Sequence, residues 1–393
     1  MALHHSLLRL RRGARTAVAV TIVFSGLSRA VGAQDTSRAP ATGAGDTAAT
    51  ASSAQDTNLI SATLTADSAT RAALASRLPR DRMDTIAAFP IRRLADGVYA
   101  VVGDTGRGSE GRSNAGFIIT DTGVVVIDAL ASPGQGEVLL RTVRTVTQLP
   151  IRWLILTHHH PDHTFGAIVF KRLGATIIAH PDRRTLASAD GDDALVSGWS
   201  GVLGLRQMRG FEFADTPDIP VTRDTTLVLG GRTLTFLHPS AAHTAGDLMI
   251  WLAKERVLFA GDILVEDGVT MVVDGNSGAL LAALDTIKAL QPAVVLPGHG
   301  RIPDDPAELV KLTSCYVLGL RAAMRSDVEQ GVRMGRALAA LPPADRDRPI
   351  SKASRQRRNA VRVYNEMEEA VMRGDTAAAT SRAEAARLSS CQR

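Results

Sequence analysis

The chain has 393 residues, of which 45% are hydrophobic and 22% charged, a balance that excludes fibrous and wholly disordered proteins. Aromatic residues make up only 4% of it, so aliphatic side chains have to supply most of the core. The formal net charge of +5 does not indicate a nucleic-acid partner, because the first 33 residues hold five arginines and no acidic residue, which leaves the remainder near neutrality.

Residues 1–33 have the pattern of a secretory signal peptide. Four arginines between positions 9 and 15 form a basic start, and the apolar run from Thr16 to Leu27 is too short to span a bilayer. Val31-Gly32-Ala33 supplies the small residues that a signal peptidase requires. We therefore expect cleavage before Gln34, a periplasmic or secreted protein and no stable membrane insertion; the alternative is an uncleaved membrane anchor.

The next segments differ sharply in composition. Residues 34–60 are rich in Ala, Thr, Ser, Gly and Asp, with almost no large apolar side chains, which predicts a flexible linker. Residues 61–90 form a lead-in segment to a domain that we expect over residues 91–302.

Two successive sets of strands and helices are predicted within this domain. The first has strands at Val98–Val102, Ala115–Ile119, Val124–Asp128, Arg152–Leu156 and Thr176–Ala179, with helices at Glu137–Thr147 and Ala167–Leu173. The second has strands at Thr225–Leu229, Thr233–Leu237, Leu248–Leu252, Arg256–Ala260 and Ala293–Leu296, with a helix at Gly278–Leu290. Two αβ halves of similar design indicate two sheets packed face to face with helices outside.

Strand signals end after Pro303, so residues 303–393 are expected to form a helical C-terminal extension. Helices are predicted at Ala307–Val332 and Ser354–Arg373; the sequence assigns them neither a role nor an oligomeric state. Cys315 and Cys391 are the only cysteines. An oxidising compartment permits one disulfide between them, but two cysteines are no disulfide framework, and we expect two unpaired thiols.

Four candidate metal ligands directly follow a predicted buried strand, in the sequence His158-His-His160-Pro-Asp162-His163. His158 and His160 leave the extended segment on the same side, because side chains alternate along a strand. The proline and Asp162 suit the first turn of a helix, which brings Asp162 and His163 to the same opening. Imidazole nitrogen and carboxylate oxygen are ligands that zinc accepts readily. A solvated polar loop is the alternative interpretation.

Three more candidates, His243, Asp262 and His299, each follow a predicted strand and stand beside glycine or another small residue. Ligand crevices form at this position in open α/β sheets. Taken singly, each residue also suits a cap or a turn. Together with the first four they supply seven ligands, enough for two ions with a water between them.

These motifs resemble the signature of the metallo-β-lactamase superfamily, over about residues 91–302. The resemblance implies an α/β fold, a four-layer αββα sandwich with its site at the edge between the two halves. It also implies two zinc ions, one held by His158, His160 and His243, the other by Asp162, His163 and His299, with Asp262 bridging both. Asp128, at the end of a predicted strand, matches a family aspartate that supports the site from outside the ligand shell.

One departure from the β-lactamases narrows the expected function. True β-lactamases typically carry Cys or Ser at the position of Asp262, and an aspartate there resembles the glyoxalase II-like, lactonase-like and sulfur-metabolism-associated hydrolases. Flavo-diiron relatives replace the second histidine of the signature with Glu. The histidine here is His160, which favours zinc over a redox-active pair.

We therefore predict an exported zinc-dependent hydrolase that acts on a small molecule. A metal-activated hydroxide would cleave an ester, thioester, lactone or amide bond, with Asp162 orienting the nucleophile and accepting its proton. Two alternatives stay open: a β-lactam hydrolase, and a non-hydrolytic metal-binding or redox accessory protein on the same fold.

Overall fold

A computed structural model describes residues 86–103, 112–182, 189–266, 268–341, 350–374 and 378–391. The expected signal peptide, the linker at 34–60 and most of the lead-in segment lie outside the described residues. None of the helices in the described ranges is long and apolar enough to cross a membrane.

The first half of the domain forms a seven-stranded sheet in chain order. Its strands are β1 (Ile91–Ala95), β2 (Val98–Val101), β3 (Ala115–Ile119), β4 (Val124–Ile127), β5 (Ile151–Ile155), β6 (Thr176–Ala179) and β7 (Ile219–Pro220). Strands β1 to β4 pair antiparallel, and β4 to β7 pair parallel. The parallel part needs crossover connections, which α4 (Pro133–Arg144) and α6 (Ala167–Arg172) provide.

The second half forms a five-stranded sheet in the order β12-β11-β10-β9-β8. Its strands are β8 (Thr225–Leu229), β9 (Arg232–Leu237), β10 (Met249–Leu252), β11 (Val257–Val265) and β12 (Val294–His299). Only β11 and β12 pair parallel, and α8 (Ser277–Leu290) makes the crossover between them.

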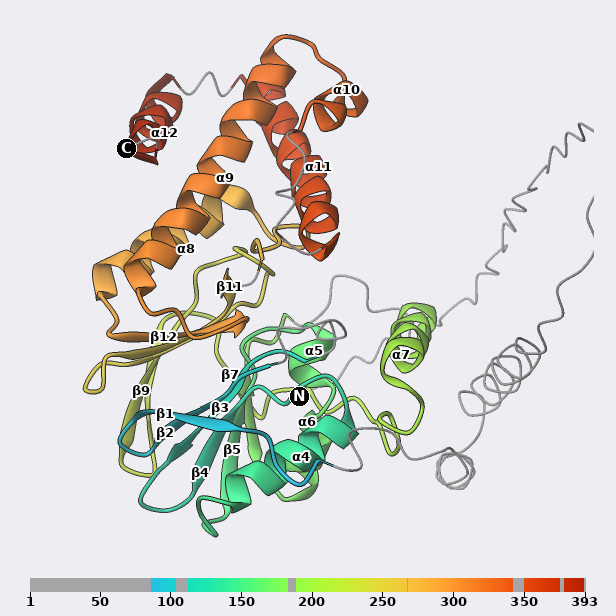
Figure 1. Ribbon diagram of the computed structural model, residues 1–393, viewed down its shortest axis with the longest axis vertical. Helices are drawn as coiled ribbons and strands as arrows, with labels where there is room; N and C mark the ends of the chain where they lie inside the picture. Colours follow the sequence, from blue (N-terminus) through green and yellow to red (C-terminus); the bar gives the residue numbers. More distant parts are fainter. Residues whose placement is uncertain are drawn as a thin grey trace, which may run out of the picture. The chain divides into compact units, whose positions relative to one another are not determined.

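Three separate apolar layers confirm the αββα sandwich (Figure 1). Phe117 belongs to the layer between the first sheet and helices α4 and α6, whereas the adjacent Ile118 belongs to the layer between the two sheets. Leu258 and Phe259 divide in the same way between the outer and inner layers of the second sheet. Because successive strand side chains point to opposite faces, strands buried on both faces are apolar throughout.

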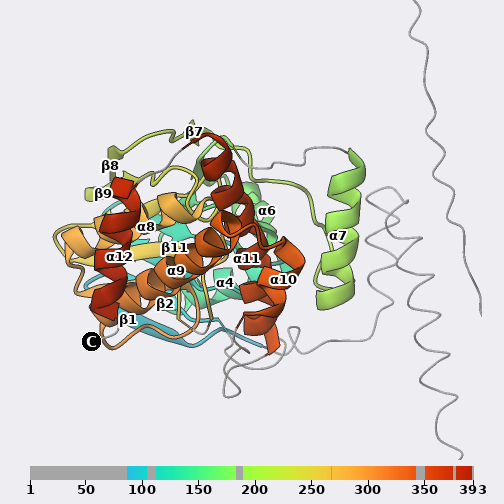
Figure 2. The same ribbon diagram turned by 90° about the horizontal axis from the view of Figure 1, so that it is seen from above.

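The C-terminal extension covers the outer face of the second sheet. It consists of α9 (Pro306–Glu329), α10 (Met334–Ala339), α11 (Ile350–Met372) and α12 (Ala378–Cys391). Helix α9 packs against α8, α11 and α12 (Figure 2). The sequence predicted α9 and α11 but neither α10 and α12 nor α7 (Ala189–Leu203), whose three glycines at positions 191, 198 and 201 lower its helix propensity.

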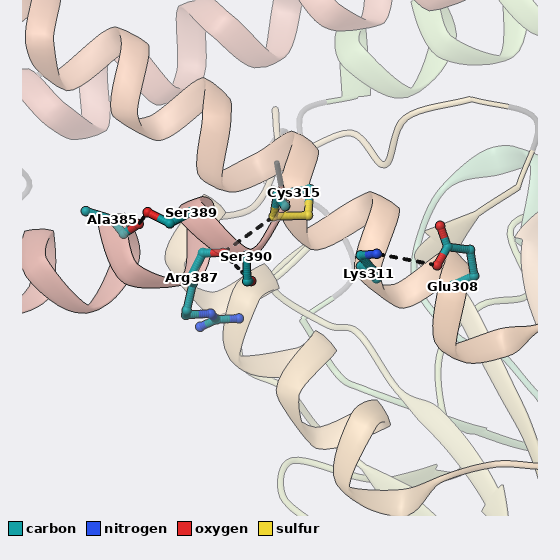
Figure 3. Close-up of a disulfide and its surroundings, with 8 residues drawn as sticks. Glu308, Lys311, Cys315, Ala385, Arg387, Ser389 and Ser390 are labelled. Atoms are coloured by element: carbon teal, nitrogen blue, oxygen red, sulfur yellow. Dashed lines mark hydrogen bonds and ion pairs between the residues drawn. A yellow bond between two sulfur atoms is a disulfide. The ribbon is translucent and has the colours of Figure 1, made fainter. Parts of the chain in front are cut away.

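The expectation of two unpaired thiols is wrong. Cys315 on α9 and Cys391 at the end of α12 form a disulfide with a Cα–Cα distance of 5.7 Å (Figure 3). The two cysteines are 76 residues apart in sequence, and only the packing of α12 against α9 brings them together. That packing is tertiary, so cysteine spacing alone could not predict it.

Candidate metal centre

The seven predicted ligands converge at one edge of the sandwich. His158 and His160 follow β5, Asp162 and His163 lie in α5 (Pro161–Thr164), His243 lies between β9 and β10, Asp262 lies in β11, and His299 ends β12. Potential ligand atoms within 4.8 Å of one another form two groups there. The first group is His158, His160, His243 and Asp262, and the second group is Asp162, His163 and His299.

Asp262 belongs to the first group and also faces the second. Its Oδ1 is 3.3 Å from His163 Nε2, and its Oδ2 is 3.6 Å from His243 Nε2 and also 3.6 Å from His299 Nε2. One carboxylate thus faces histidines of both groups. The geometry is compatible with the bridging role that the resemblance implies, and that role stays a prediction.

Helix α5 brings the first four candidates together as the sequence predicted. His160 is its N-cap residue, with extended backbone angles of φ −62° and ψ 144°, and Pro161 follows at the first helical position. Proline suits that position because it has no N–H and its φ is already helical. The chain therefore changes from strand to helix between the two pairs of candidate ligands.

The structure corrects the strand positions of Asp262 and His299. Both were predicted just past a strand end, but Asp262 lies inside β11, where the pairing with β12 is irregular, and His299 is the last residue of β12. Such irregularities redirect side chains beside functional sites. Gly298 is required here, because a Cβ at this position would lie 1.8 Å from Asp262 Oδ1.

Four of the five histidines use their outward ring nitrogen to donate a hydrogen bond to an oxygen atom. The bonds are His158 Nδ1 to Thr157 Oγ1 at 3.0 Å, His160 Nε2 to Asp274 Oδ2 at 3.0 Å, His163 Nδ1 to Asp128 Oδ2 at 2.8 Å, and His243 Nδ1 to Met271 O at 2.7 Å. A ring nitrogen that donates outward leaves the inward nitrogen with a lone pair. This tautomer is the one a metal-binding histidine requires.

Several inward atoms fit a bound cation. His158 Nε2, His163 Nε2 and Asp262 Oδ1 are buried and have no hydrogen-bond partner among the described residues, although buried polar atoms are normally paired. His160 Nδ1 and His243 Nε2 lie 3.0 Å apart, so two lone pairs would repel unless a cation or a proton lay between them. Imidazole and carboxylate donors of this kind suit zinc.

The electrostatics of the two groups differ. Burial, followed by repulsion from the neighbouring histidines, lowers the pKa of His158 well below its ordinary value and favours the neutral ligand form. Burial opposes charge on His163 too, but the carboxylates of Asp128 and Asp262 outweigh it and raise the pKa of His163. Burial also opposes charge on Asp162, yet the histidines of its group lower its pKa. The carboxylates around the second group therefore favour a bound cation there, whether a proton or a metal ion.

Asp128, predicted to support the site from outside, contacts His163 directly. It accepts hydrogen bonds from His163 Nδ1, from Thr157 N at 2.8 Å and from Thr157 Oγ1 at 2.9 Å. Its backbone is left-handed, with φ 60°, a conformation that aspartate tolerates better than most residues. This conformation at the end of β4 accompanies a side chain that reaches back to the segment after β5.

Ser113 and Asn114 both hold the second group, and neither was predicted from the sequence. Ser113 Oγ donates to the Asp162 carbonyl at 2.6 Å, and Asn114 Nδ2 donates to the carbonyls of Pro297 at 2.8 Å and Gly300 at 2.9 Å, on either side of His299. Two polar residues just before the apolar run of strand β3 were the available signal, and the structure shows that both are buried. Their partners are 49 to 186 residues away, beyond the reach of local patterns.

Asp247 and Asp274 were missed as well. Asp247 is buried and accepts hydrogen bonds from the backbone N–H groups of His243 and Thr244, and burial raises the pKa of its carboxyl group. It fixes the turn that carries His243. Asp274 belongs to a third group of potential ligands with His160 and His159, in which His160 is shared with the first group.

Comparisons with known proteins agree with this geometry. A sequence profile of the Metallo-beta-lactamase superfamily matches residues 108–299. The chain is 26% identical over 229 residues to a Beta-lactamase-like protein 2 homolog from Caenorhabditis elegans, and the aligned region covers 56% of this chain and 67% of that protein. It is 24% identical over 217 residues to Metallo-beta-lactamase type 2 from Bacteroides fragilis, at 53% and 78% coverage. A solved metallo-beta-lactamase family protein from Thermus thermophilus aligns with a TM-score of 0.53 and 20% identity, over 72% of this chain and 95% of that one.

Proposed function

Since residues 108–299 belong to the metallo-β-lactamase superfamily, we propose that this chain is a zinc-dependent hydrolase with two metal ions. One observation carries the proposal. Inward-facing histidine and aspartate atoms form two groups, Asp262 faces histidines of both, and three of these atoms are buried without a hydrogen-bond partner among the described residues.

The proposed ligand sets are unequal in charge. The first ion would be held by His158, His160 and His243, and the second ion would be held by Asp162, His163 and His299. Asp262 would contact both ions. When bound, the ions would supply hydroxide near neutral pH and polarise the bond to be cleaved. The chain's own contribution is to fix the ring orientations of its histidines through their outward hydrogen bonds.

Asp162 has a narrower proposed role than the sequence suggested. Its Oδ2 lies 2.8 Å from His299 Nε2, and its neighbouring histidines lower its pKa. A carboxylate with a low pKa is a weak base. We therefore assign Asp162 to orienting the nucleophile by accepting a hydrogen bond, rather than to retaining its proton.

The proposed substrates are small molecules with an ester, thioester, lactone or amide bond. Aspartate at position 262 favours the Asp-bridged hydrolases over the true β-lactamases, so β-lactam hydrolysis is a secondary activity at most. We also propose export to the periplasm or the medium. The Cys315–Cys391 disulfide supports this location, because structural disulfides persist in oxidising compartments.

The test combines metal analysis with a substrate panel. Gently purified protein should contain about two zinc ions per chain and hydrolyse at least one thioester, lactone, ester or β-lactam. A chelator should abolish turnover, and added zinc should restore it. Stoichiometric iron in place of zinc, or no metal uptake at all, would refute the proposal. Two bound zinc ions without turnover across the panel would favour the non-hydrolytic accessory role.

A further inference from the structure

The segment Thr270–Ser277, here called the site strap, contacts the candidate metal centre. It leads from β11 to the start of α8. The carbonyl of Met271 accepts a hydrogen bond from His243 Nδ1 at 2.7 Å, and Asp274 Oδ2 lies 3.0 Å from His160 Nε2. The strap therefore orients two of the three histidines proposed for the first ion, because the outward partner of a histidine sets its tautomer and ring direction.

Helix α11 holds the strap on its other side, and its central contact is Asn359. This side chain is fully buried. Its Oδ1 accepts a hydrogen bond from Val272 N at 2.9 Å, and its Nδ2 donates to Thr270 O at 2.8 Å. The two bonds lie on either side of Met271, so one amide fixes the backbone that presents a carbonyl to His243.

Two further residues on the same face of α11 hold the second half of the strap. Arg362 Nε donates to the carbonyl of Gly275 at 3.0 Å, and the Glu366 carboxylate accepts from Ser277 N at 3.2 Å. Positions 359, 362 and 366 share one face because three- and four-residue steps follow the helical repeat. These contacts lie just beyond Asp274, so α11 fixes the strap next to both of its contacts with the centre.

The strap also packs tightly against the turn that carries His243. Asn276 N donates to the carbonyl of Ala242 at 3.2 Å. A Cβ on Gly275 would lie 2.1 Å from that same carbonyl oxygen, so only glycine fits. A strap that shifted would therefore displace both the oxygen acceptor of His243 and the backbone beside it.

We propose that α11 of the C-terminal extension positions the first metal site through the site strap, with Asn359 as the main positioning residue. This inference rests on the proposed function in that it takes the three-histidine group to bind zinc. It gives the extension a role in metal binding although the extension contributes no ligand to either group.

The test measures zinc affinity in Asn359→Ala. The zinc-loaded full chain is titrated with a chromophoric chelator, and release of the two ions is followed as separate steps. Loss of an outer-shell contact typically weakens metal binding by 10- to 100-fold. Asn359 lies one contact further from the metal, so we expect zinc affinity to fall by about tenfold, and only in one of the two release steps. Cobalt substitution should show an altered visible spectrum for the three-histidine site.

Two variants make the result specific. Tyr364→Phe is the matched control, because Tyr364 is a buried residue of α11 whose hydroxyl donates to Val332 O, away from the strap. It should leave zinc affinity unchanged. Arg362→Met is the second test, since Arg362 is partly exposed, its loss empties no core space, and it removes the bond to Gly275.

The outcomes separate the two proposals. If wild-type protein takes up no zinc, the proposed function and this inference both fall. If it binds two ions and folded Asn359→Ala and Arg362→Met keep wild-type affinity and spectrum, only the inference falls. Equal weakening by Tyr364→Phe also overturns it, because general loosening would then explain the effect. If Asn359→Ala does not fold, Arg362→Met decides.

Discussion

The candidate metal centre and the C-terminal helices are built in opposite ways. The centre takes side chains from short segments at the strand ends, and Asp128, with φ 60°, has a strained left-handed backbone beside it. The C-terminal helices are regular, and α9 and α11 are long. Past Gln291, no non-glycine residue in the described ranges has a positive φ.

The difference indicates how the two regions divide their tasks. Backbone strain and buried, unpaired polar atoms cost stability, and they are tolerated where a bound ligand or the surrounding structure compensates. Regular helices that cover an apolar sheet face supply stability instead. Changes at the centre should therefore alter metal binding more than folding, and changes in the helices should do the reverse, with the site strap as the exception.

The largest effect on the centre should come from Asp262→Ala. This change removes the shared carboxylate and leaves each proposed ion with three protein ligands, so at least one zinc per chain should be lost. Turnover should fall by on the order of a hundredfold or more, comparable to other losses of electrostatic stabilisation. Zinc content, turnover and circular dichroism measure the effect. Asp96→Ala, at an exposed position, is the control.

Unchanged zinc content together with unchanged turnover in Asp262→Ala would contradict the bridging role. Loss of the circular dichroism spectrum of the folded protein would instead show that Asp262 stabilises the fold. The centre and the helices would then not divide metal binding and stability between them.

A smaller effect is expected from Asp128→Asn. Asparagine tolerates the left-handed backbone as well as aspartate does, but an amide cannot accept all three hydrogen bonds that Asp128 receives. The affinity of the second site for zinc should fall by about 10- to 100-fold, as measured by chelator competition. The exposed Asp121→Asn is the control, and wild-type affinity in Asp128→Asn would contradict the role of Asp128 in orienting His163.

Cys391→Ser tests the other region. Breaking a cross-link over 76 residues should lower the free energy of unfolding by about 2–4 kcal/mol, as measured by urea unfolding. Zinc content and turnover should stay at wild-type levels. Reductant should reproduce the loss in wild-type protein and add nothing in the variant. Loss of zinc would show that α12 also supports the centre.

The smallest effect is expected from Arg387→Met. Arg387 on α12 pairs with Asp285 on α8 at 2.8 Å, with both side chains more than a third exposed (37% and 54%). Exposed ion pairs contribute about 0–1 kcal/mol, so urea unfolding should change little. A loss as large as that of Cys391→Ser would mean that charge, rather than the disulfide, holds α12 to the domain.

The same comparison explains what the sequence could and could not predict. Most strands of both sheets were predictable because buried strands appear as apolar runs between glycine and aspartate turns. The ligand candidates were recognisable because four of them lie within six residues and the others follow strands. Their convergence at one edge follows from parallel pairing of β4 with β5 and of β11 with β12.

The remaining features depend on contacts between distant parts of the chain. Asn114 and Asn359 act on backbone groups more than 80 residues away, and no local pattern records such pairs. The disulfide was missed for the same reason. Helices α10 and α12 offered only short or weakly amphipathic patterns, and short helices owe their stability to packing rather than propensity.

The disulfide has a topological consequence for the extension. It closes residues 315–391 into a covalent ring that contains α10 and α11. A protease that cut one peptide bond within this ring would nick the chain without releasing a fragment, since both pieces stay linked through sulfur. Under non-reducing conditions the nicked protein would migrate as one species, and the helix that holds the site strap would remain tethered to the domain.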